Sequence, residues 1–429
     1  MLEIDITEKV FIHFKIPKSD FNVNSFVNYC DKAGKTLSRK LFVNFMLKAQ
    51  DLILMEYIGV RWGKPTGKIT PWECPKCTAR IGFKRRGNRN RTLKTSIGTV
   101  VFPLLQVTCS ECGKTFSPFP TLLGFSARRQ LTRELEQKLC GVVKNLSYGK
   151  TANMVNEIFG LKLSPHTIHK VVQKYGAKAK IIEDLSHISH LQSDSTKINA
   201  SNSERGLDVH LALVIGPSDK RNGRKYRHKT LATVQVSNSP TSVKKLLKKS
   251  QVDQITVDGK SGLEKFIEEK NIPTTVQRCL WHIPRTAAHM MYLDGLGIVN
   301  GRELSKPLKS ILLNEQLSVN ARLAMYDSFV EDCQKAVLKK TVTFLENARC
   351  NLFTYKQFAD QDVHGRTNSI IERQMREINR RMENGTRWSD TGAQNLLTLK
   401  LIHEMNPDSY ANLWNLTKNK NFNYQVILC

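Results

Sequence analysis

The chain has 429 residues, of which 40% are hydrophobic and 24% charged, so we expect two to four soluble domains. A formal net charge of +28 favours a polyanionic partner, with nucleic acid ahead of an anionic membrane surface. No stretch approaches the roughly 20 apolar residues of a spanning helix, and Glu3, Asp5 and Glu8 are unlike the basic start of a signal peptide. We therefore expect a cytoplasmic, nucleoid-associated protein with no membrane partner and with reduced cysteines.

The first segment, residues 1–70, is predicted to be an N-terminal helical region. Apolar residues recur at helical spacing through 38–60. The segment carries no motif for binding or catalysis. We therefore expect it to serve in packing or assembly.

Two Cys-x-x-Cys pairs mark residues 71–119, which we predict to be a zinc ribbon. Each pair lets two thiolates bind one ion from a tight turn, and two pairs complete a tetrahedral shell without an open position. The zinc would therefore be structural. Four unrelated reduced cysteines are the alternative, which the paired spacing disfavours. The predicted ligands are Cys74, Cys77, Cys109 and Cys112.

The stretch between the two cysteine pairs is basic and has no acidic residue between Thr78 and Ser110. A basic hairpin on a metal-held base is suited to DNA phosphates. An ordinary solvated basic loop is the alternative. The predicted DNA contacts here are Lys84, Arg85, Arg86 and Arg89.

Residues 121–180 are predicted to form a helix-turn-helix DNA-binding domain. Gly160 is expected to end one helix, and Ser164 with Pro165 to begin the next. Two short helices around a glycine turn match that layout, although a plain helical hairpin would give a similar pattern. The polar positions predicted to meet DNA are His166, Thr167, His169 and Lys170.

The segment 188–282 alternates between strand and helix patterns. Three runs read as antiparallel strands, and two later runs, 254–262 and 274–282, alternate with helices. This order is the ribonuclease H-like pattern, in which functional sites lie at strand ends. The predicted fold class is therefore multidomain α/β, with a ribonuclease H-like catalytic core preceded by the ribbon and the helix-turn-helix.

Two aspartates lie in that sheet. Asp194 falls within the first predicted strand and Asp258 ends the fourth. Carboxylates among apolar residues are costly unless they are paired or bind a cation, which suggests a shared Mg²⁺. Glu372 is the best third carboxylate, because it shares a face with Asn368 in a helix starting near Thr367. Taken singly, each acid is as well explained by a capped turn or a solvated face.

Cys279 and His282 form a Cys-x-x-His pair after an apolar run. Half of a zinc site would need a second Cys/His pair in a comparable block, and the sequence has none. The cysteine quartet is also complete without these two residues. A nucleophilic pair is not needed for metal-assisted phosphoryl transfer. We therefore interpret the pair as the end of a core strand, with a buried Cys279 and with His282 reaching the active site or the DNA.

Four blocks of this sequence resemble those of DDE transposases, most closely the Mutator-like and related prokaryotic insertion-sequence enzymes. They are "DSTKI" at 194–198, "VDG" at 257–259, "RCLWHIPR" at 278–285 and "TNSIIERQ" at 367–374. Asp-Ser-Thr replaces the more common Asp-Gly-Thr in the first block. The resemblance implies a core of 188–282 plus 351–405, a helical insertion of 283–350 and a C-terminal tail of 406–429.

The same resemblance implies a chemistry and its residues. The expected cofactor is Mg²⁺ or Mn²⁺ at the catalytic acids, which are Asp194, Asp258 and Glu372. The expected supporting residues are Cys279, His282, Asn368 and Lys197. Arg285 is a further possible phosphate contact, and Arg376 and Arg380 are expected to meet the DNA backbone.

The implied reaction is metal-dependent DNA cleavage and strand transfer of an insertion sequence. Its partners would be double-stranded DNA at the terminal inverted repeats and the target, bound by a homo-oligomer of at least two chains. The alternative is a non-catalytic, domesticated or truncated transposase-derived DNA-binding protein. A ribonuclease H-like nuclease acting on structured DNA is a third possibility.

Overall fold

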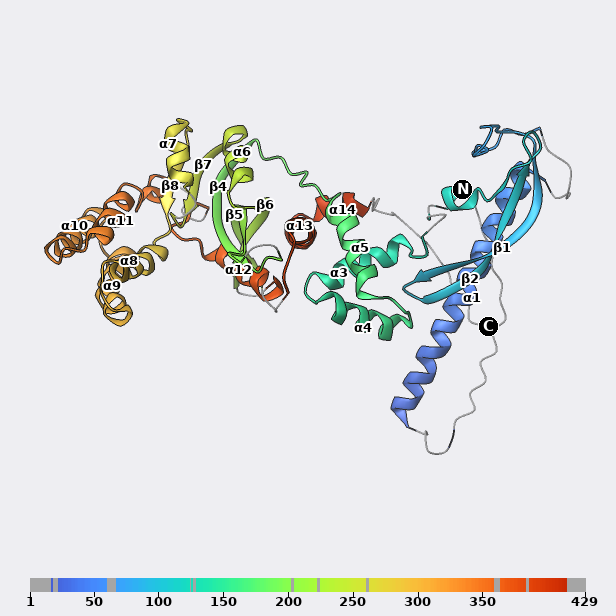
Figure 1. Cartoon of the computed structure of the whole chain (residues 1–429), viewed down its shortest axis with the longest axis horizontal. Helices are drawn as coiled ribbons and strands as arrows, with labels where there is room; N and C mark the ends of the chain where they lie inside the picture. Colours follow the sequence, from blue (N-terminus) through green and yellow to red (C-terminus); the bar gives the residue numbers. More distant parts are fainter. Residues whose placement is uncertain are drawn as a thin grey trace. The chain divides into compact units, whose positions relative to one another are not determined.

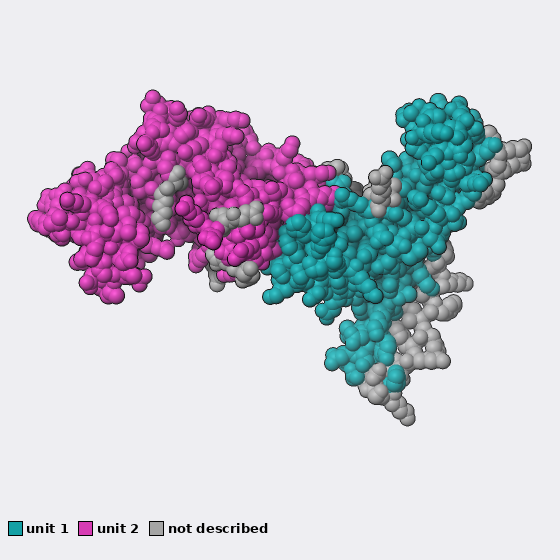
Figure 2. Space-filling view, viewed as in Figure 1, with its two compact units in different colours: residues 1–171 teal, residues 172–429 magenta. Residues whose placement is uncertain are grey.

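The computed structural model describes residues 17, 22–59, 67–123, 125, 129–201, 204–221, 224–259, 262–358, 363–382 and 386–414. It divides into unit 1, residues 1–171, and unit 2, residues 172–429, coloured separately in Figure 2. Most of the predicted tail, 415–429, lies outside the described residues, as do residues 1–16. Within the described residues, no helix combines the length and the apolar character that a membrane crossing requires.

Unit 1 begins with a long helix and a three-stranded sheet (Figure 1). Helix α1, Val23–Tyr57, starts where the Asn22 side chain accepts a hydrogen bond from the Ser25 amide. The sheet has the order β1-β2-β3 and is antiparallel; its strands are β1 Phe83–Thr95, β2 Gly98–Cys109 and β3 Thr115–Phe116.

Helix α1 is held against this sheet by one buried polar side chain and an apolar cluster. The Gln50 amide donates to the Pro103 carbonyl (3.1 Å) and accepts from the Leu105 amide (2.9 Å). Because Gln50 is fully buried, these bonds fix the register of helix on strand. The apolar cluster includes Leu54, Ile58, Trp72, Phe83 and Phe102.

Four helices follow the sheet: α2 Phe119–Leu122, α3 Arg133–Val143, α4 Tyr148–Phe159 and α5 Pro165–Gly176. The expected helix signals are confirmed. Gly160 ends α4 with a left-handed φ of 61°, and the Ser164 hydroxyl accepts from the Thr167 amide at the start of α5 (3.2 Å). The boundary between the two units falls within α5.

Unit 2 is built on a five-stranded sheet of order β6-β5-β4-β7-β8. Strands β4, β5 and β6 are antiparallel, whereas β7 and β8 run parallel to β4. The strands are β4 His187–Ile198, β5 Leu207–Arg221, β6 Arg224–Val236, β7 Gln251–Val257 and β8 Thr275–Arg278, with α6 Thr241–Lys249 and α7 Leu263–Glu269 between the last three. The sheet core is aliphatic, and includes Leu191, Ala212, Ile255 and Val257.

The last two strands are shorter than the sequence predicted. Strand β7 ends at Val257 rather than continuing to 262, and β8 ends at Arg278. The expected strand 274–282 is therefore wrong in its second half: Cys279 begins a turn, and His282 is the first residue of a helix. The turn closes with a hydrogen bond from the His282 amide to the Cys279 carbonyl (3.0 Å).

The region after β8 is helical and forms its own apolar cluster, which includes Leu280, Ile283, Leu308, Tyr326 and Leu345. Its helices are α8 His282–Leu293, α9 Ile298–Leu313, α10 Val319–Lys335 and α11 Lys339–Arg349, and a 3-10 turn follows at Thr354–Gln357. Figure 1 draws these helices as one group in unit 2, beyond β8.

Three further helices return to the sheet: α12 Ser369–Met382, α13 Asp390–Met405 and α14 Pro407–Trp414. Helix α12 packs against β4, and α13 packs against β6. Unit 2 is therefore a mixed α/β unit in which a late helix covers the strand that carries Asp194.

Candidate active site and metal centre

Two carboxylates lie at matching positions along two neighbouring strands. Asp194 is on β4, and Asp258 directly follows the last residue of β7. The two strands are parallel and pair Gln192 with Thr256, so each aspartate lies two residues beyond the same paired position. Parallel neighbours with this register bring the two side chains to one end of the sheet.

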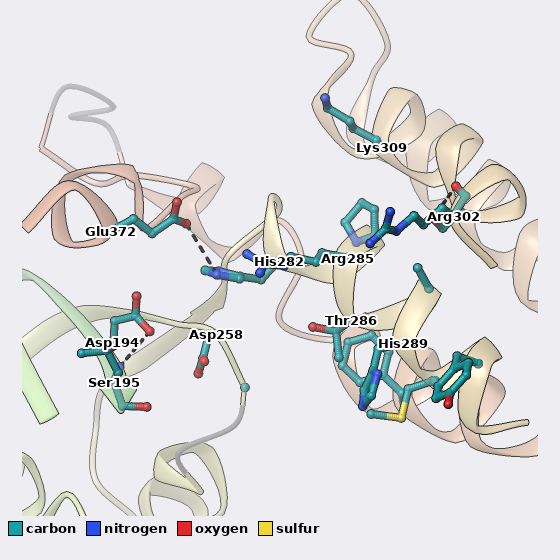
Figure 3. A pocket seen from close by; sticks show the side chains of 18 of the residues that line it. Asp194, Ser195, Asp258, His282, Arg285, Thr286, His289, Arg302, Lys309 and Glu372 are labelled. Atoms are coloured by element: carbon teal, nitrogen blue, oxygen red, sulfur yellow. Dashed lines mark hydrogen bonds and ion pairs between the residues drawn. The ribbon is translucent and has the colours of Figure 1, made fainter. Parts of the chain in front are cut away.

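The third acid comes from a different element. Glu372 lies in the first turn of α12. Together with Asp194 and Asp258 it lines a cleft of about 1250 Å³ (Figure 3). Asp258 is buried, with 8% of its surface exposed, whereas the Glu372 side chain is 37% exposed. Hence the structure brings all three predicted acids together in one cleft.

The three acids have the chemistry of a hard-cation site, because oxygen ligands are those that Mg²⁺ and Mn²⁺ prefer. In this structure their ligand atoms do not all lie within 4.8 Å of one another, unlike those of the cysteine quartet. The three side chains would therefore have to move closer together to share one ion.

A largely buried ion pair lies against Gly259, the residue after Asp258. The Arg278 guanidinium contacts the Glu264 carboxylate, and it packs against Gly259, whose φ is 88°. A side-chain carbon at position 259 would overlap Arg278, so a glycine is required there. Burial raises the pKa of Glu264, and the nearby Arg278 opposes this shift.

The Cys-x-x-His pair contacts the helix that carries Glu372. The Cys279 sulfur accepts a hydrogen bond from the Asn368 amide (3.2 Å), and Nε2 of His282 lies 3.6 Å from Oε1 of Glu372. Burial raises the pKa of the Cys279 thiol to about 11, which favours the neutral form and opposes a nucleophilic role.

The same three side chains lie close enough to share an ion. The ligand atoms of Cys279, His282 and Glu372 are all within 4.8 Å of one another. The pair also contacts α12 directly, through the Cys279 sulfur at the Asn368 backbone amide and through His282 at Glu372.

Two polar side chains tie the start of α12 to β4. The Asn368 amide group donates to the Ser193 carbonyl (3.2 Å). Gln192 donates to the Thr367 carbonyl (2.9 Å) and accepts from the Ile371 amide (3.2 Å). Because these strand residues immediately precede Asp194, the bonds fix Glu372 relative to the strand that carries the first acid.

Lys197 is not brought to the cleft. It is exposed on β4 and is not among the residues that line the cleft. Its neighbour Thr196 does line the cleft and donates to the Asn379 side chain (3.0 Å). The three residues before it, Asp194, Ser195 and Thr196, all line the cleft, so the lining ends one residue short of Lys197 and its supporting role stays a prediction.

The wall opposite the acids comes from α8 and α9, a region in which Arg285 was the one residue predicted from the sequence to contact a phosphate of the substrate. It carries exposed basic and aromatic side chains (Figure 3). Their spacing of four and then three residues along each helix is the signal that was available, because it places them on one face. They are Arg285, His289 and Tyr292 on α8, and Arg302, Lys306 and Lys309 on α9.

The two arginines predicted on α12 differ in position. Arg376 lines the cleft. Arg380 does not; it is 75% exposed and forms an ion pair with Glu377 (2.9 Å). Only Arg376 is thus placed beside the acids.

The four predicted zinc ligands lie together in unit 1. The Sγ atoms of Cys74 and Cys112 are 3.5 Å apart, those of Cys77 and Cys109 are 3.6 Å apart, and all four lie within 4.8 Å of one another. Such separations are close to those of a tetrahedral shell with Zn–S bonds of about 2.3 Å. The cluster fits a structural zinc ion.

The two cysteine turns have the same backbone geometry. Thr78 donates its amide to the Cys74 carbonyl (2.9 Å), and Gly113 donates to the Cys109 carbonyl (3.0 Å). Both donors have a left-handed φ, 57° for Thr78 and 68° for Gly113. Matching turns aim each pair of thiols at a common point, which supports a built metal centre.

The predicted DNA contacts of unit 1 are only partly available. Arg86 and Arg89 are exposed and Lys84 is half-buried on β1, but Arg85 is turned toward α1, where it lies 3.5 Å from Asp51 and is 11% exposed. A strand irregularity between Arg85 and Gly87 accompanies this orientation.

In α5, the four predicted positions also divide into two kinds. His166 and Lys170 are exposed. Thr167 is engaged in the Ser164 cap. His169 packs edge-on to Tyr148, with ring centroids 5.3 Å apart, and partial burial lowers its pKa. His166 and Lys170 are therefore the available pair.

Comparisons with known proteins agree over most of the chain. Residues 75–410 match the family described as "Transposase, Mutator family". The transposase for insertion sequence element IS905 of Lactococcus lactis subsp. lactis (strain IL1403) is 24% identical over 340 residues, which cover 76% of this chain and 80% of that protein.

Among solved structures, a chain of the simian T-cell lymphotropic virus intasome in complex with PP2A regulatory subunit B56 gamma is 10% identical. The match covers 43% of this chain and 70% of that one, with a TM-score of 0.14. A score this low carries no argument about the fold.

Proposed function

The chain belongs to the Mutator family of transposases, and we propose on that basis that it cleaves and joins DNA at Asp194, Asp258 and Glu372. The observation that carries this proposal is that the three carboxylates, from β4, from the residue after β7 and from α12, line one cleft. Their convergence from elements far apart in the sequence favours a catalytic site over three separate capping or surface roles.

The proposed catalytic core is ribonuclease H-like. The support is the strand order β6-β5-β4-β7-β8, with three antiparallel and two parallel strands, and the return of α12 to β4. We assign 188–282 plus 351–405 to this core and 283–350 to a helical insertion. The zinc ribbon of 71–119 and the helix-turn-helix of 121–180 remain the proposed DNA-binding domains, preceded by the helical region 1–70.

The proposed reaction is phosphoryl transfer between DNA strands. A water oxygen attacks phosphorus at the end of the insertion sequence, and the strand leaves as a 3′-hydroxyl. That hydroxyl then attacks a phosphodiester of the target, which releases a 3′-hydroxyl of the target strand. Bound Mg²⁺ or Mn²⁺ would supply Lewis-acid charge for both displacements.

The protein's own part is to hold the acids and the DNA in place. Asp194 and Asp258 are fixed by the pairing of their strands. Asn368 and Gln192 fix α12 against β4, and Cys279 binds the backbone amide of Asn368, just before the helix. We assign Cys279, Asn368 and Gln192 as positioning residues, and His282 as the neighbour that orients Glu372.

The proposed partner is double-stranded DNA, at the terminal inverted repeats and at the target. The net charge of +28 and the exposed Arg86, Arg89, His166 and Lys170 support backbone contacts by unit 1. Because two DNA ends are joined, the active form is proposed to be a homo-oligomer of at least two chains, in the cytoplasm at the nucleoid.

The test uses DNA that carries the terminal sequences flanking the gene, with Mg²⁺ or Mn²⁺. Asp194→Asn, Asp258→Asn and Glu372→Gln are expected to abolish nicking and joining while DNA binding remains. The matched control is Glu377→Gln, an exposed acid of the same helix that does not line the cleft. Normal cleavage in the three variants would sink the assignment, and metal-independent binding without cleavage by the wild type would favour the non-catalytic alternative.

A further inference from the structure

The cleft has two chemically different walls. One carries Asp194, Asp258 and Glu372; the other is formed by α8 and α9. No acidic side chain lines the cleft from these two helices in the part of the chain that the structure describes, whereas four cations do: Arg285, Arg302, Lys306 and Lys309. Figure 3 shows Arg285, Arg302 and Lys309 across the cleft from the acids.

The second wall is built by close helix packing. The carbon that a side chain would add at Gly301 would lie 2.9 Å from the Ala288 carbonyl oxygen, so a glycine lets α9 approach α8 closely. Leu308 of α9 and Met291 of α8 are buried in the shared apolar cluster. On the side that faces the cleft, each helix presents exposed side chains: Arg285, His289 and Tyr292 on α8, and Arg302, Lys306 and Lys309 on α9.

The wall also offers aromatic faces. Tyr292 lines the cleft, is 48% exposed, and stacks on His289 with ring centroids 6.3 Å apart. Trp281, which directly precedes α8 and does not itself line the cleft, is equally exposed, and Lys309 Nζ lies 4.4 Å from the centre of its ring. Cations beside exposed rings are the combination that binds an unpaired strand, because phosphates meet the charges and bases stack on the rings.

We propose that the α8–α9 wall binds an unpaired segment of DNA next to the phosphate that is cleaved. This inference rests on the proposed function, because it takes the carboxylates as the point where the strand is cut. Paired DNA keeps its base faces inside the helix and presents only base edges and phosphates. The exposed rings of Tyr292 and Trp281 therefore favour a strand whose bases are free.

The test measures DNA binding by the full chain without divalent metal, so that no cleavage occurs. A single-stranded oligonucleotide containing 5-iododeoxyuridine and its duplex are compared by fluorescence anisotropy over a range of salt. Arg302→Ala/Lys309→Ala removes two cations of the wall. The control Lys245→Ala/Lys249→Ala removes two exposed cations of α6 that do not line the cleft. Photo-crosslinks are located by mass spectrometry of peptides.

The wall variant is expected to lose roughly tenfold in single-strand affinity, with a salt slope smaller by about 1.4 for two lost phosphate contacts. Crosslinks in the wild type are expected at Tyr292 or Trp281. The α6 control should retain wild-type affinity. Wild-type affinity in the wall variant, or equal losses for single strand and duplex without crosslinks in α8 or α9, would overturn the proposal.

Failure of this inference is distinguishable from failure of the proposed function. Asp194→Asn is expected to bind the single strand normally while losing cleavage. Cleavage by Asp194→Asn would refute the catalytic assignment, and with it the proposed location of the wall at the cleaved phosphate. The measured binding of single-stranded DNA to the wall would still stand. Undiminished single-strand binding by the wall variant would refute the role of the wall and leave the catalytic assignment unaffected.

Discussion

The sulfur of Cys279 accepts a hydrogen bond from the backbone amide of Asn368 across 3.2 Å. Cys279 directly follows β8, and Asn368 directly precedes α12. The bond thus joins the sheet edge to the helix that carries Glu372. The Asn368 amide lies before the first turn of the helix, where it has no partner within the helix.

Replacing Cys279 with alanine is expected to lower kcat for cleavage roughly tenfold, with little change in KM, because Glu372 would be held less firmly while DNA contacts remain. Cys279→Ser should recover part of kcat, since a hydroxyl also accepts this hydrogen bond. Steady-state cleavage kinetics measure both constants. Cys333→Ala, at a buried cysteine of the helical insertion, is the control. An equal fall in kcat for that variant would refute a positioning role.

The cysteine quartet predicts a single structural zinc ion per chain. Cys77→Ser is expected to remove the ion and to destabilise unit 1 by several kcal/mol, because metal binding is coupled to folding of such a centre. Elemental analysis measures the zinc. Trp72 lies in the adjacent core, with its ring centroid 6.0 Å from that of Phe83. A change in its fluorescence therefore reports the loss of packing.

Cys30→Ser is the matched control, since Cys30 is exposed and outside the cluster. It should retain both the zinc and the fluorescence of the wild type. Full zinc content in Cys77→Ser would show that the ion, if any, is bound elsewhere.

Gly259→Ala is expected to reduce cleavage by roughly a hundredfold, because the new side chain would displace either Arg278 or the backbone beside Asp258. Gly262→Ala is an unusually close control. Gly262 also has a left-handed φ, 63°, but nothing lies within 4 Å of the position that a side chain would take. Both variants should lose about 1 kcal/mol of stability from backbone strain. Gly262→Ala is expected to cleave DNA at close to the wild-type rate, whereas Gly259→Ala is not. Equal cleavage rates in the two variants would disprove the role of the Arg278 contact.

Because His190 is buried, we expect mild acid to lower the free energy of unfolding of unit 2. The ring is fully buried, with Nδ1 2.8 Å from the Val363 carbonyl oxygen and Nε2 2.8 Å from the Thr256 hydroxyl. Burial lowers its pKa from 6.5 to about 3, and His364 and Arg227 add to the shift. Below pH 6.5 the unfolded chain therefore binds a proton that the folded chain does not.

The stability contributed by neutral His190 is complete above pH 6.5 and falls by about 1.4 kcal/mol per pH unit between pH 6.5 and pH 3. Denaturant unfolding at pH 7 and pH 5 should differ by about 2 kcal/mol from this group. His190→Gln should flatten the dependence. His187→Gln, at a half-exposed histidine of the same strand, should not. An unchanged pH dependence in His190→Gln would contradict the prediction.

The sequence predicted well those features that are local or that recur as short blocks. Gly160 and Ser164 act within one helical turn, so their residue types suffice to place a helix end and a helix start. Asp194, Asp258 and Glu372 were proposed from acids among apolar strand residues and from a shared helix face, and the resemblance of their blocks to a known family supported the choice. Their meeting in one cleft depends on strand pairing, which no single block contains.

What the sequence missed depends on orientation. Lys197 lies near Asp194 in the chain, but the lining of the cleft ends at its neighbour Thr196. Arg85 looked equivalent to its basic neighbours, yet the irregularity before Gly87 accompanies its turn toward Asp51. The α8–α9 wall was missed because its cations come from two helices, and only the packing at Gly301 brings these onto one surface.

The position of the helical insertion has a consequence for synthesis of the protein on the ribosome. Asp194 and Asp258 leave the ribosome with the sheet, but Glu372 follows only after α8–α11 have been made. Since chains fold progressively from the N-terminus, a nascent chain holds two acids and an open edge until the whole insertion has emerged. A prematurely terminated chain would thus keep the proposed DNA-binding regions and lack Glu372, so on the proposed function it would compete with the full-length protein without cleaving DNA.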